Sequence, residues 1–168
     1  VSLKMHDVSS FERIDSDLLI NTGSPHYLIL RGSLDNFDLI NDAQAIRYND
    51  RFKDEGVNVN FISANEEYVQ IRTYERGVED ETLSCGTGVT AAALGNHIFS
   101  NKADGTYKQA MASMGGSLEV EYTAVNGQFT DIYLKGPAKE VFKGEVELIK
   151  SRMVNPHRES LSPKLIRK

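Results

Sequence analysis

The sequence predicts an α+β fold, in which a mainly antiparallel sheet holds one buried helix and one covering helix. Short runs of alternating apolar and polar residues recur along the 168-residue chain. Residues 88–99 have almost no polar face, which indicates a buried helix. Asn126-Gly127 stands between two of the alternating runs and is a strong hairpin signal.

The elements follow from these patterns in chain order. Leu39, Ala43 and Ile46 have helical spacing, so residues 34–48 are expected to form the covering helix, capped by Asp35 or Asn36. The expected strands are residues 16–21, 27–31, 57–63, 69–74, 108–114, 117–124, 129–134 and 138–149. Residues 78–84 are expected to form a loop.

In the strand at residues 57–63, Asn58 and Asn60 share the face opposite Val57, Val59 and Phe61. Asn is uncommon in strands, so this second face is either a solvated edge or part of a polar site.

The length and composition indicate the number of domains and exclude some classes of binding partner. One domain is expected at residues 1–150, followed by a mobile basic tail at residues 151–168. The net charge of −5 argues against general binding to nucleic acid or an anionic membrane. No apolar run is long enough for a membrane span, and residues 1–10 have no signal-peptide pattern.

The cysteine count bears on location and metal binding. The single cysteine fits a reducing cytoplasm and excludes a site with several thiolate ligands. The four histidines are scattered along the chain, so no metal site is expected.

The single cysteine, Cys85, lies directly before the buried helix, where Ser84 or Thr87 is the expected cap. The free N–H groups at a helix start, together with the helix dipole, stabilise a thiolate and bind a carboxylate. Gly86 and Gly88 let a ligand approach the backbone. This pairing suits proton abstraction at the α-carbon of an amino acid. An inert buried cysteine is the alternative, and the residues alone leave both open.

Three further residues, His26, Glu75 and Arg76, have simple interpretations. His26 follows Pro25 at the start of a strand, where hydrogen bonding to a loop carbonyl is the usual role of a single histidine. Glu75 and Arg76 end a strand upstream of the cysteine, and an arginine there is suited to a second carboxylate.

Five segments resemble the diaminopimelate epimerase family. Residues 75–93 (ERGVEDETLSCGTGVTAAA) are similar to its second cysteine motif. Residues 21–29 (NTGSPHYLI) resemble its Pro-His turn, and residues 56–62 (GVNVNFI) its Asn-bearing strand. Residues 115–122 and 134–148 resemble its closing strands.

The resemblance implies a curved, mainly antiparallel sheet around a central helix, as one of two pseudo-symmetric domains. Family members use neither pyridoxal phosphate nor a metal. One cysteine from each domain faces the substrate α-carbon, and the pair interconverts LL- and meso-diaminopimelate on the route to lysine and peptidoglycan precursors. The implied partners of this chain are the substrate and a first domain with the other cysteine.

The resemblance also implies roles for individual residues. Cys85 is the proton acceptor and donor, and His26 and Glu75 adjust the acidity of the cysteine thiols. The backbone of Gly86 and Thr87 holds the reacting carboxylate.

At the distal end of the substrate, Asn58, Glu75 and Arg76 are the implied contacts. Ser24 stands where the family usually has a substrate-binding Asn and is expected to bind through its hydroxyl or a water.

Two alternatives remain at this point. The proline racemase and hydroxyproline epimerase group also has a Cys-Gly-Thr-Gly turn, but an Asp-Arg-Ser-Pro stretch normally precedes it, and here Glu-Thr-Leu-Ser does. The isolated chain is alternatively a non-catalytic binding module, because one thiol alone does not invert a centre.

The apolar side chains of residues 138–149 are expected to be exposed without the first domain and to promote a homodimer or aggregation. These side chains are Val141, Phe142, Val146 and Leu148.

Overall fold

The computed structural model describes residues 1–146. The chain divides into two units, Val1–Ala138 and Lys139–Lys168. All of the regular secondary structure in the described residues belongs to the first unit. No helix in this part of the chain is long and apolar enough to cross a membrane.

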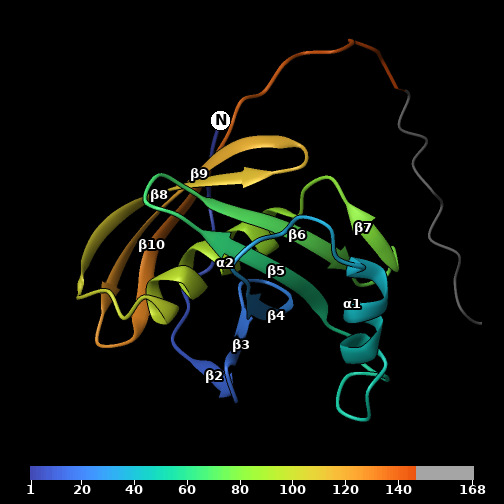
Figure 1. Ribbon diagram of the computed structural model, residues 1–168. Coiled ribbons are helices and arrows are strands. Elements are labelled where there is room, and N and C mark those ends of the chain that lie inside the picture. The colour runs from blue at the N-terminus through green and yellow to red at the C-terminus, as the bar shows by residue number, and fades with distance from the viewer. Residues whose placement is uncertain (147–168) are drawn as a thin grey trace, which may run out of the picture. The chain divides into compact units, whose positions relative to one another are not determined.

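The first unit is one mixed sheet with two helices (Figure 1). Its strands are β1 (Ser2–Lys4), β2 (Phe11–Ile14), β3 (Asp17–Asn21), β4 (Pro25–Leu30), β5 (Asn58–Ala64), β6 (Val69–Glu75), β7 (Asp80–Thr82), β8 (Gly105–Ser113), β9 (Gly116–Val125) and β10 (Gln128–Lys135). The helices are α1 (Leu39–Arg47) and α2 (Gly86–Phe99). The strand order is β1-β10-β9-β8-β6-β5-β4-β3-β2, with β7 on β6.

Most neighbouring strands are antiparallel, as predicted, and the exceptions are β4–β5 and β6–β8. Both parallel pairs are joined through a helix, α1 in the first case and α2 in the second. A parallel pair needs such a crossover because the chain must return to the same end of the sheet.

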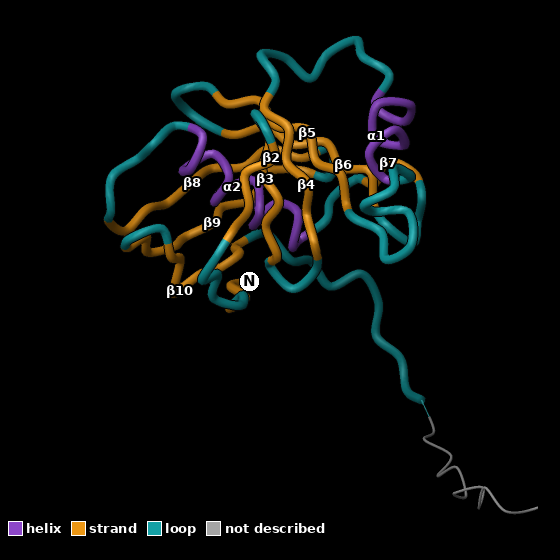
Figure 2. The backbone as a smooth tube through the Cα atoms, turned by 90° about the horizontal axis from the view of Figure 1, so that it is seen from below, coloured by secondary structure: helices purple, strands orange, loops and turns teal. Residues whose placement is uncertain are grey.

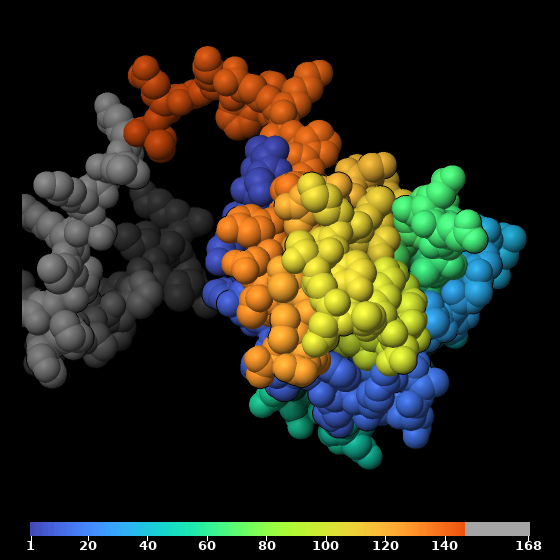
Figure 3. All heavy atoms as spheres, turned by 90° about the vertical axis from the view of Figure 1, so that its left-hand side faces the viewer, coloured from blue at the N-terminus to red at the C-terminus, as the bar shows by residue number. Residues whose placement is uncertain are grey.

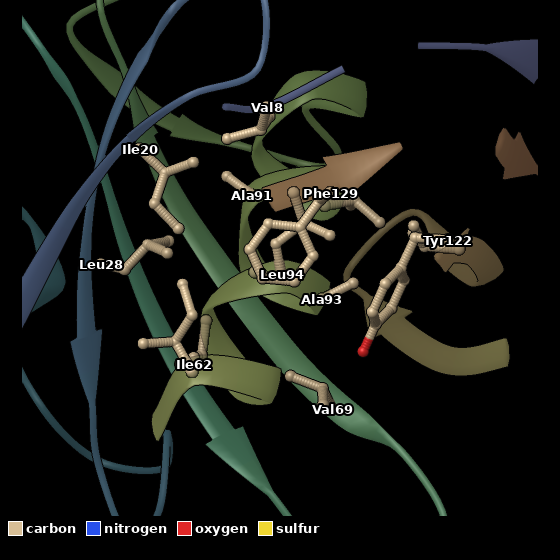
Figure 4. Packing of buried hydrophobic residues seen from close by; sticks show 14 of the residues in the cluster. Val8, Ile20, Leu28, Ile62, Val69, Ala91, Ala93, Leu94, Tyr122 and Phe129 are labelled. Carbon is tan, nitrogen blue, oxygen red and sulfur yellow. The ribbon is translucent and has the colours of Figure 1, made fainter. Parts of the chain in front are cut away.

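The sheet curls around α2 (Figures 1 and 2), which confirms the predicted buried helix. Every residue of α2 from Gly88 to Ile98 is buried, and the helix contacts β3 to β6 and β8 to β10. Small side chains make this close approach possible. Ala91 and Ala93 lie beside Leu94 in the core that Ile20 and Leu28 line from the strands (Figure 4).

The covering helix α1 packs against the opposite face of the sheet, where Leu39 and Ala43 meet Val59 and Phe61 in a second core. This confirms the alternation expected for β5. The helix is shorter than expected, and its cap is Asp38, whose side chain accepts from the N–H of Asn41. The expected caps, Asp35 and Asn36, are therefore wrong.

The late start of α1 has a physical reason. Asn36 has a φ of 54°, which is the left-handed region and is incompatible with a right-handed helix. Leu34 instead joins the α1 core from the preceding loop.

Three short strands were not expected from the sequence: β1, β2 and β7. Residues 78–84, which were predicted as a loop, contain β7 paired with β6. Strand β1 pairs with β10, and Leu3 lies opposite Leu134. Figure 3 shows these N-terminal residues, in blue, beside the orange residues of β10. The first and last strands of the unit are therefore neighbours in the sheet.

The predicted strand at residues 138–149 is wrong over its described part, because residues 138–146 form no strand. An extended segment needs a neighbour for its N–H and C=O groups, and both edges of β10 are taken by β9 and β1. Val141, Phe142 and Val146 are each more than 80% exposed, as expected. Leu148 and the predicted tail at residues 151–168 lie outside the described residues.

Candidate active site

Cys85 is the N-cap residue of α2, so the predicted position of the thiol directly before the helix is confirmed. Its backbone is extended, with φ −117° and ψ 111°, and no side chain caps the helix start. The expected caps, Ser84 and Thr87, are therefore wrong. The N–H groups of Gly86 and Thr87 lack partners within the helix because they lie in its first turn. Gly86 is exposed and Cys85 is half-buried, so a ligand can reach both.

A buried polar cluster lies behind this helix start. His26 is completely buried on β4, and its Nε2 lies 3.0 Å from the Thr87 hydroxyl. Thr87 Oγ1 in turn lies 3.4 Å from the sulfur of Cys85. Ser24 Oγ lies 3.0 Å from the same Nε2 and 3.2 Å from Thr87 Oγ1. The structure thus connects His26 to Cys85 through one hydroxyl.

Burial, with a smaller contribution from the positive charge of Arg76, lowers the pKa of His26 from 6.5 to about 4. The ring is therefore neutral at pH 7. A neutral, buried imidazole serves the cluster as a fixed hydrogen-bonding group, and it carries no charge to pair with a thiolate.

Asn58 ties Ser24 to the end of β6. Its Nδ2 donates to Ser24 Oγ at 3.2 Å and to the carbonyl of Pro25 at 3.0 Å. Its Oδ1 accepts the backbone N–H of Arg76 at 3.0 Å. Asn58 is nearly fully buried, and these three bonds occupy its amide.

Arg76 and Glu75 lie at the rim. The Arg76 guanidinium donates to the carbonyl of Glu55 at 2.9 Å. Its stem crosses Gly56, where a Cβ would come within 2.5 Å of Arg76 Cδ. Gly56, whose φ is 77°, thus leaves the space that this side chain occupies.

The Glu75 carboxylate is half-buried and accepts a hydrogen bond from the Thr82 hydroxyl at 2.8 Å. Within residues 1–146 the structure gives this carboxylate no hydrogen bond to Cys85, Thr87 or His26. The Glu75 carboxylate thus stands apart from the cluster, as does the Arg76 guanidinium, whereas the Arg76 backbone N–H bonds to Asn58.

Asn60 and Thr73 belong to the cluster, and the sequence did not single them out as site residues. Asn60 is completely buried on β5, and its Nδ2 lies 3.1 Å from His26 Nδ1. Thr73 lies directly opposite on β6 and donates to Asn60 Oδ1 at 3.0 Å. The signal that pointed to Asn60 was its alternation with Asn58 on a strand.

The described residues bring no three His, Cys, Asp or Glu side chains together at a spacing that suits a metal ion. The site offers three kinds of chemical group: a thiol, a set of neutral hydrogen-bond donors and acceptors, and a helix N-terminus that favours an anion.

The comparisons with known proteins agree with the motifs. A family model described as diaminopimelate epimerase matches residues 18–141. The diaminopimelate epimerase of Flavobacterium psychrophilum is 44% identical over 147 residues, which are 85% of this chain and 56% of that protein. The one of Chlorobaculum tepidum is 38% identical over 130 residues, or 77% and 49% of the two chains. The chain therefore spans about half the length of these curated relatives.

Among solved structures, the fold is similar to a hydroxyproline epimerase from Agrobacterium vitis with bound trans-4-hydroxy-L-proline. The TM-score is 0.53 at 19% sequence identity, over 80% of this chain and 49% of that one. At this identity the likeness concerns the fold, and it confirms the curled sheet around a central helix.

Proposed function

Because the chain belongs to the diaminopimelate epimerase family, we propose that it forms the half of such an enzyme that carries one of two catalytic thiols. The observation that supports this most strongly is the position of Cys85 at the start of α2, within reach of the Thr87 hydroxyl. In the complete enzyme the reaction is the interconversion of LL- and meso-diaminopimelate, for lysine and peptidoglycan precursors.

Cys85 acts as the general base and acid at the α-carbon. The thiolate removes the α-proton in one direction, and the thiol returns it in the other. The substrate carboxylate binds the free N–H groups of Gly86 and Thr87, where the helix dipole favours negative charge. The carbanion that forms next to this carboxylate is stabilised by the same groups, since the added charge spreads onto the carboxylate oxygens.

The distal end of the substrate carries a second carboxylate and a second ammonium group. Arg76 is suited to the carboxylate, because the residue is exposed at the rim and its guanidinium bonds, within residues 1–146, only to a backbone carbonyl. Glu75 is suited to the ammonium group, since it is half-buried and paired only with a hydroxyl among the described residues. Asn58 holds the strand end that carries both.

Inversion also requires an acid on the opposite face of the α-carbon, and this chain has a single cysteine. We infer that the second thiol comes from the half of the relatives that this chain does not match. Its partners are thus that half and the substrate. No metal or organic cofactor enters the reaction, because proton transfer between two thiols needs neither.

The test joins this chain to the unmatched half of the Flavobacterium psychrophilum relative and measures epimerisation of LL-diaminopimelate. Exchange of the α-hydrogen with solvent deuterium is followed in parallel. We expect Cys85→Ser to reduce turnover by about three orders of magnitude or more, because a hydroxyl is a far weaker base than a thiolate.

Ser84→Ala is the matched control, because Ser84 is the exposed neighbour of the thiol and leaves it unchanged. Undiminished turnover in Cys85→Ser would rule out the role given to this thiol. A competition between proline and diaminopimelate separates this function from that of a proline racemase or hydroxyproline epimerase, for which proline is the better substrate.

A further inference from the structure

The hydrogen positions in the buried cluster follow from its two asparagines, because backbone groups fix how each amide is oriented. Asn60 Nδ2 lies 3.2 Å from the carbonyl oxygen of Tyr27 and 3.3 Å from that of Asn58. A backbone carbonyl only accepts, so the NH₂ group of Asn60 must face these two oxygens. Its Oδ1 points to β6 and accepts from the Thr73 hydroxyl.

This orientation leaves His26 one tautomer. Its Nδ1 lies 3.1 Å from the amide nitrogen of Asn60. An amide nitrogen accepts no hydrogen bond, so a hydrogen on Nδ1 would have no acceptor there. The ring is neutral, so its single hydrogen lies on Nε2. Nε2 therefore donates toward the hydroxyls of Thr87 and Ser24, each 3.0 Å away.

A second chain of hydrogen bonds reaches the same hydroxyl from Asn58. The N–H of Arg76 fixes Asn58 Oδ1 as an acceptor, so Nδ2 donates to Ser24 Oγ. Because Nε2 of His26 is also a donor, the hydrogen of Ser24 has Thr87 Oγ1 as its remaining partner in the cluster, at 3.2 Å. Thr87 Oγ1 therefore accepts one hydrogen bond from His26 and one from Ser24.

Thr87 Oγ1 accepts from both sides, and the remaining partner for its own hydrogen is the sulfur of Cys85. We propose that Asn60 is a positioning residue that holds His26 as the Nε2–H tautomer, so that the Thr87 hydroxyl donates to the sulfur of Cys85. The use of this bond in epimerisation rests on the proposed function, whereas its direction does not.

The opposite tautomer has the opposite effect on the sulfur. With the hydrogen on Nδ1, Nε2 of His26 becomes an acceptor and takes the hydrogen of Thr87. Cys85 then faces an oxygen lone pair, which favours the thiol over the thiolate. The amide of Asn60 therefore decides, through two intervening groups, which form of Cys85 is stabilised.

The first experiment reads the tautomer directly in this chain. Long-range ¹H–¹⁵N spectra distinguish a protonated from an unprotonated ring nitrogen, and they are recorded for assigned His26 between pH 6 and pH 8. We expect Nε2 to be protonated and Nδ1 unprotonated over this range. A hydrogen on Nδ1 in the wild-type chain would overturn the proposal.

The second experiment reads the sulfur. Cys85 is the only cysteine in the chain, so the rate of alkylation by iodoacetamide against pH reports its thiolate. We expect Asn60→Leu and Thr87→Val each to slow alkylation at pH 7 about tenfold, as the loss of a hydrogen bond to a charged group does. Because both remove the same bond, the double variant is expected to be no slower than Asn60→Leu alone.

Thr73→Val is the matched control, since Thr73 is also buried in the cluster and its hydroxyl bonds, among the described residues, only to Asn60 Oδ1. It is expected to leave both the His26 tautomer and the alkylation profile unchanged. Unchanged alkylation in Thr87→Val, or an unchanged Nε2–H tautomer together with unchanged alkylation in a folded Asn60→Leu chain, contradicts the proposal. If Asn60→Leu does not fold, the wild-type tautomer and Thr87→Val decide. Neither readout needs substrate, so failure here is distinct from failure of the epimerase assignment.

Discussion

Gly88 leaves no room for a methyl group beside the buried cluster. A Cβ at this position would lie 2.8 Å from Asn60 Oδ1 and 3.3 Å from the Cβ of Cys85. We therefore expect the Asn60 amide to move in Gly88→Ala and to lose the hydroxyl of Thr73. A buried, unsatisfied carbonyl costs about 1–3 kcal/mol. Overpacking a filled core costs about 1–3 kcal/mol more.

The helix itself benefits from the same change, because alanine is favoured over glycine in a helix by about 1 kcal/mol. The net expectation for Gly88→Ala is a loss of about 1–5 kcal/mol in the free energy of unfolding. Urea unfolding followed by circular dichroism at pH 7 measures it.

Gly86→Ala is the control, since it lies in the same first turn and its Cβ would meet only the tip of Leu134, at 3.2 Å. That variant is expected to change stability by less than about 1 kcal/mol. Equal stability of Gly86→Ala and Gly88→Ala would refute the tight packing inferred around Asn60.

Two further predictions concern pH and association. Between pH 6.5 and about 4 the unfolded chain binds a proton at His26 and the folded chain does not, so acidification favours unfolding. Lowering the pH from 7 to 5 is expected to cost about 2 kcal/mol, measured by urea unfolding at both pH values. An equal pH-dependent loss of stability in the His26→Gln variant would contradict the role given to His26. The exposed Val141, Phe142 and Val146 are expected to make the chain self-associate. When all three are replaced by serine, light scattering is expected to give the mass of a monomer. A monomeric wild-type chain at all concentrations would refute it.

The local features of the site could be predicted from the sequence because they depend on neighbouring residues. The small apolar residues of α2 leave it no polar face, and the position of Cys85 at its start follows from the glycines around it. The two faces of β5 were likewise readable, since side chains alternate along any strand. The resemblance to a family added His26, which a single histidine after a proline did not justify.

Other features depend on contacts between distant parts of the chain, and only the tertiary structure decided them. Strand β1 pairs with β10, which lies at the other end of the unit in sequence, and no local pattern in residues 1–4 predicted this pairing. Residues 138–146 have the composition of a strand but form none, and the strand that pairs with the outer edge of β10 is β1. Pairing depends on which edge is free, and alternation does not report it.

The sequence by itself determined that a thiol stands at the start of a buried helix and that two asparagines share one strand face. The structure decided that Asn60, His26 and Thr87 meet, although Thr87 lies 61 residues from His26 along the chain. The parallel pairing of β4 with β5 and the burial of α2 beneath them bring these groups into contact. Hydrogen-bond direction depends on such three-dimensional neighbours, which is why the sequence identified the thiol but not the residues that orient its hydrogen-bond donor.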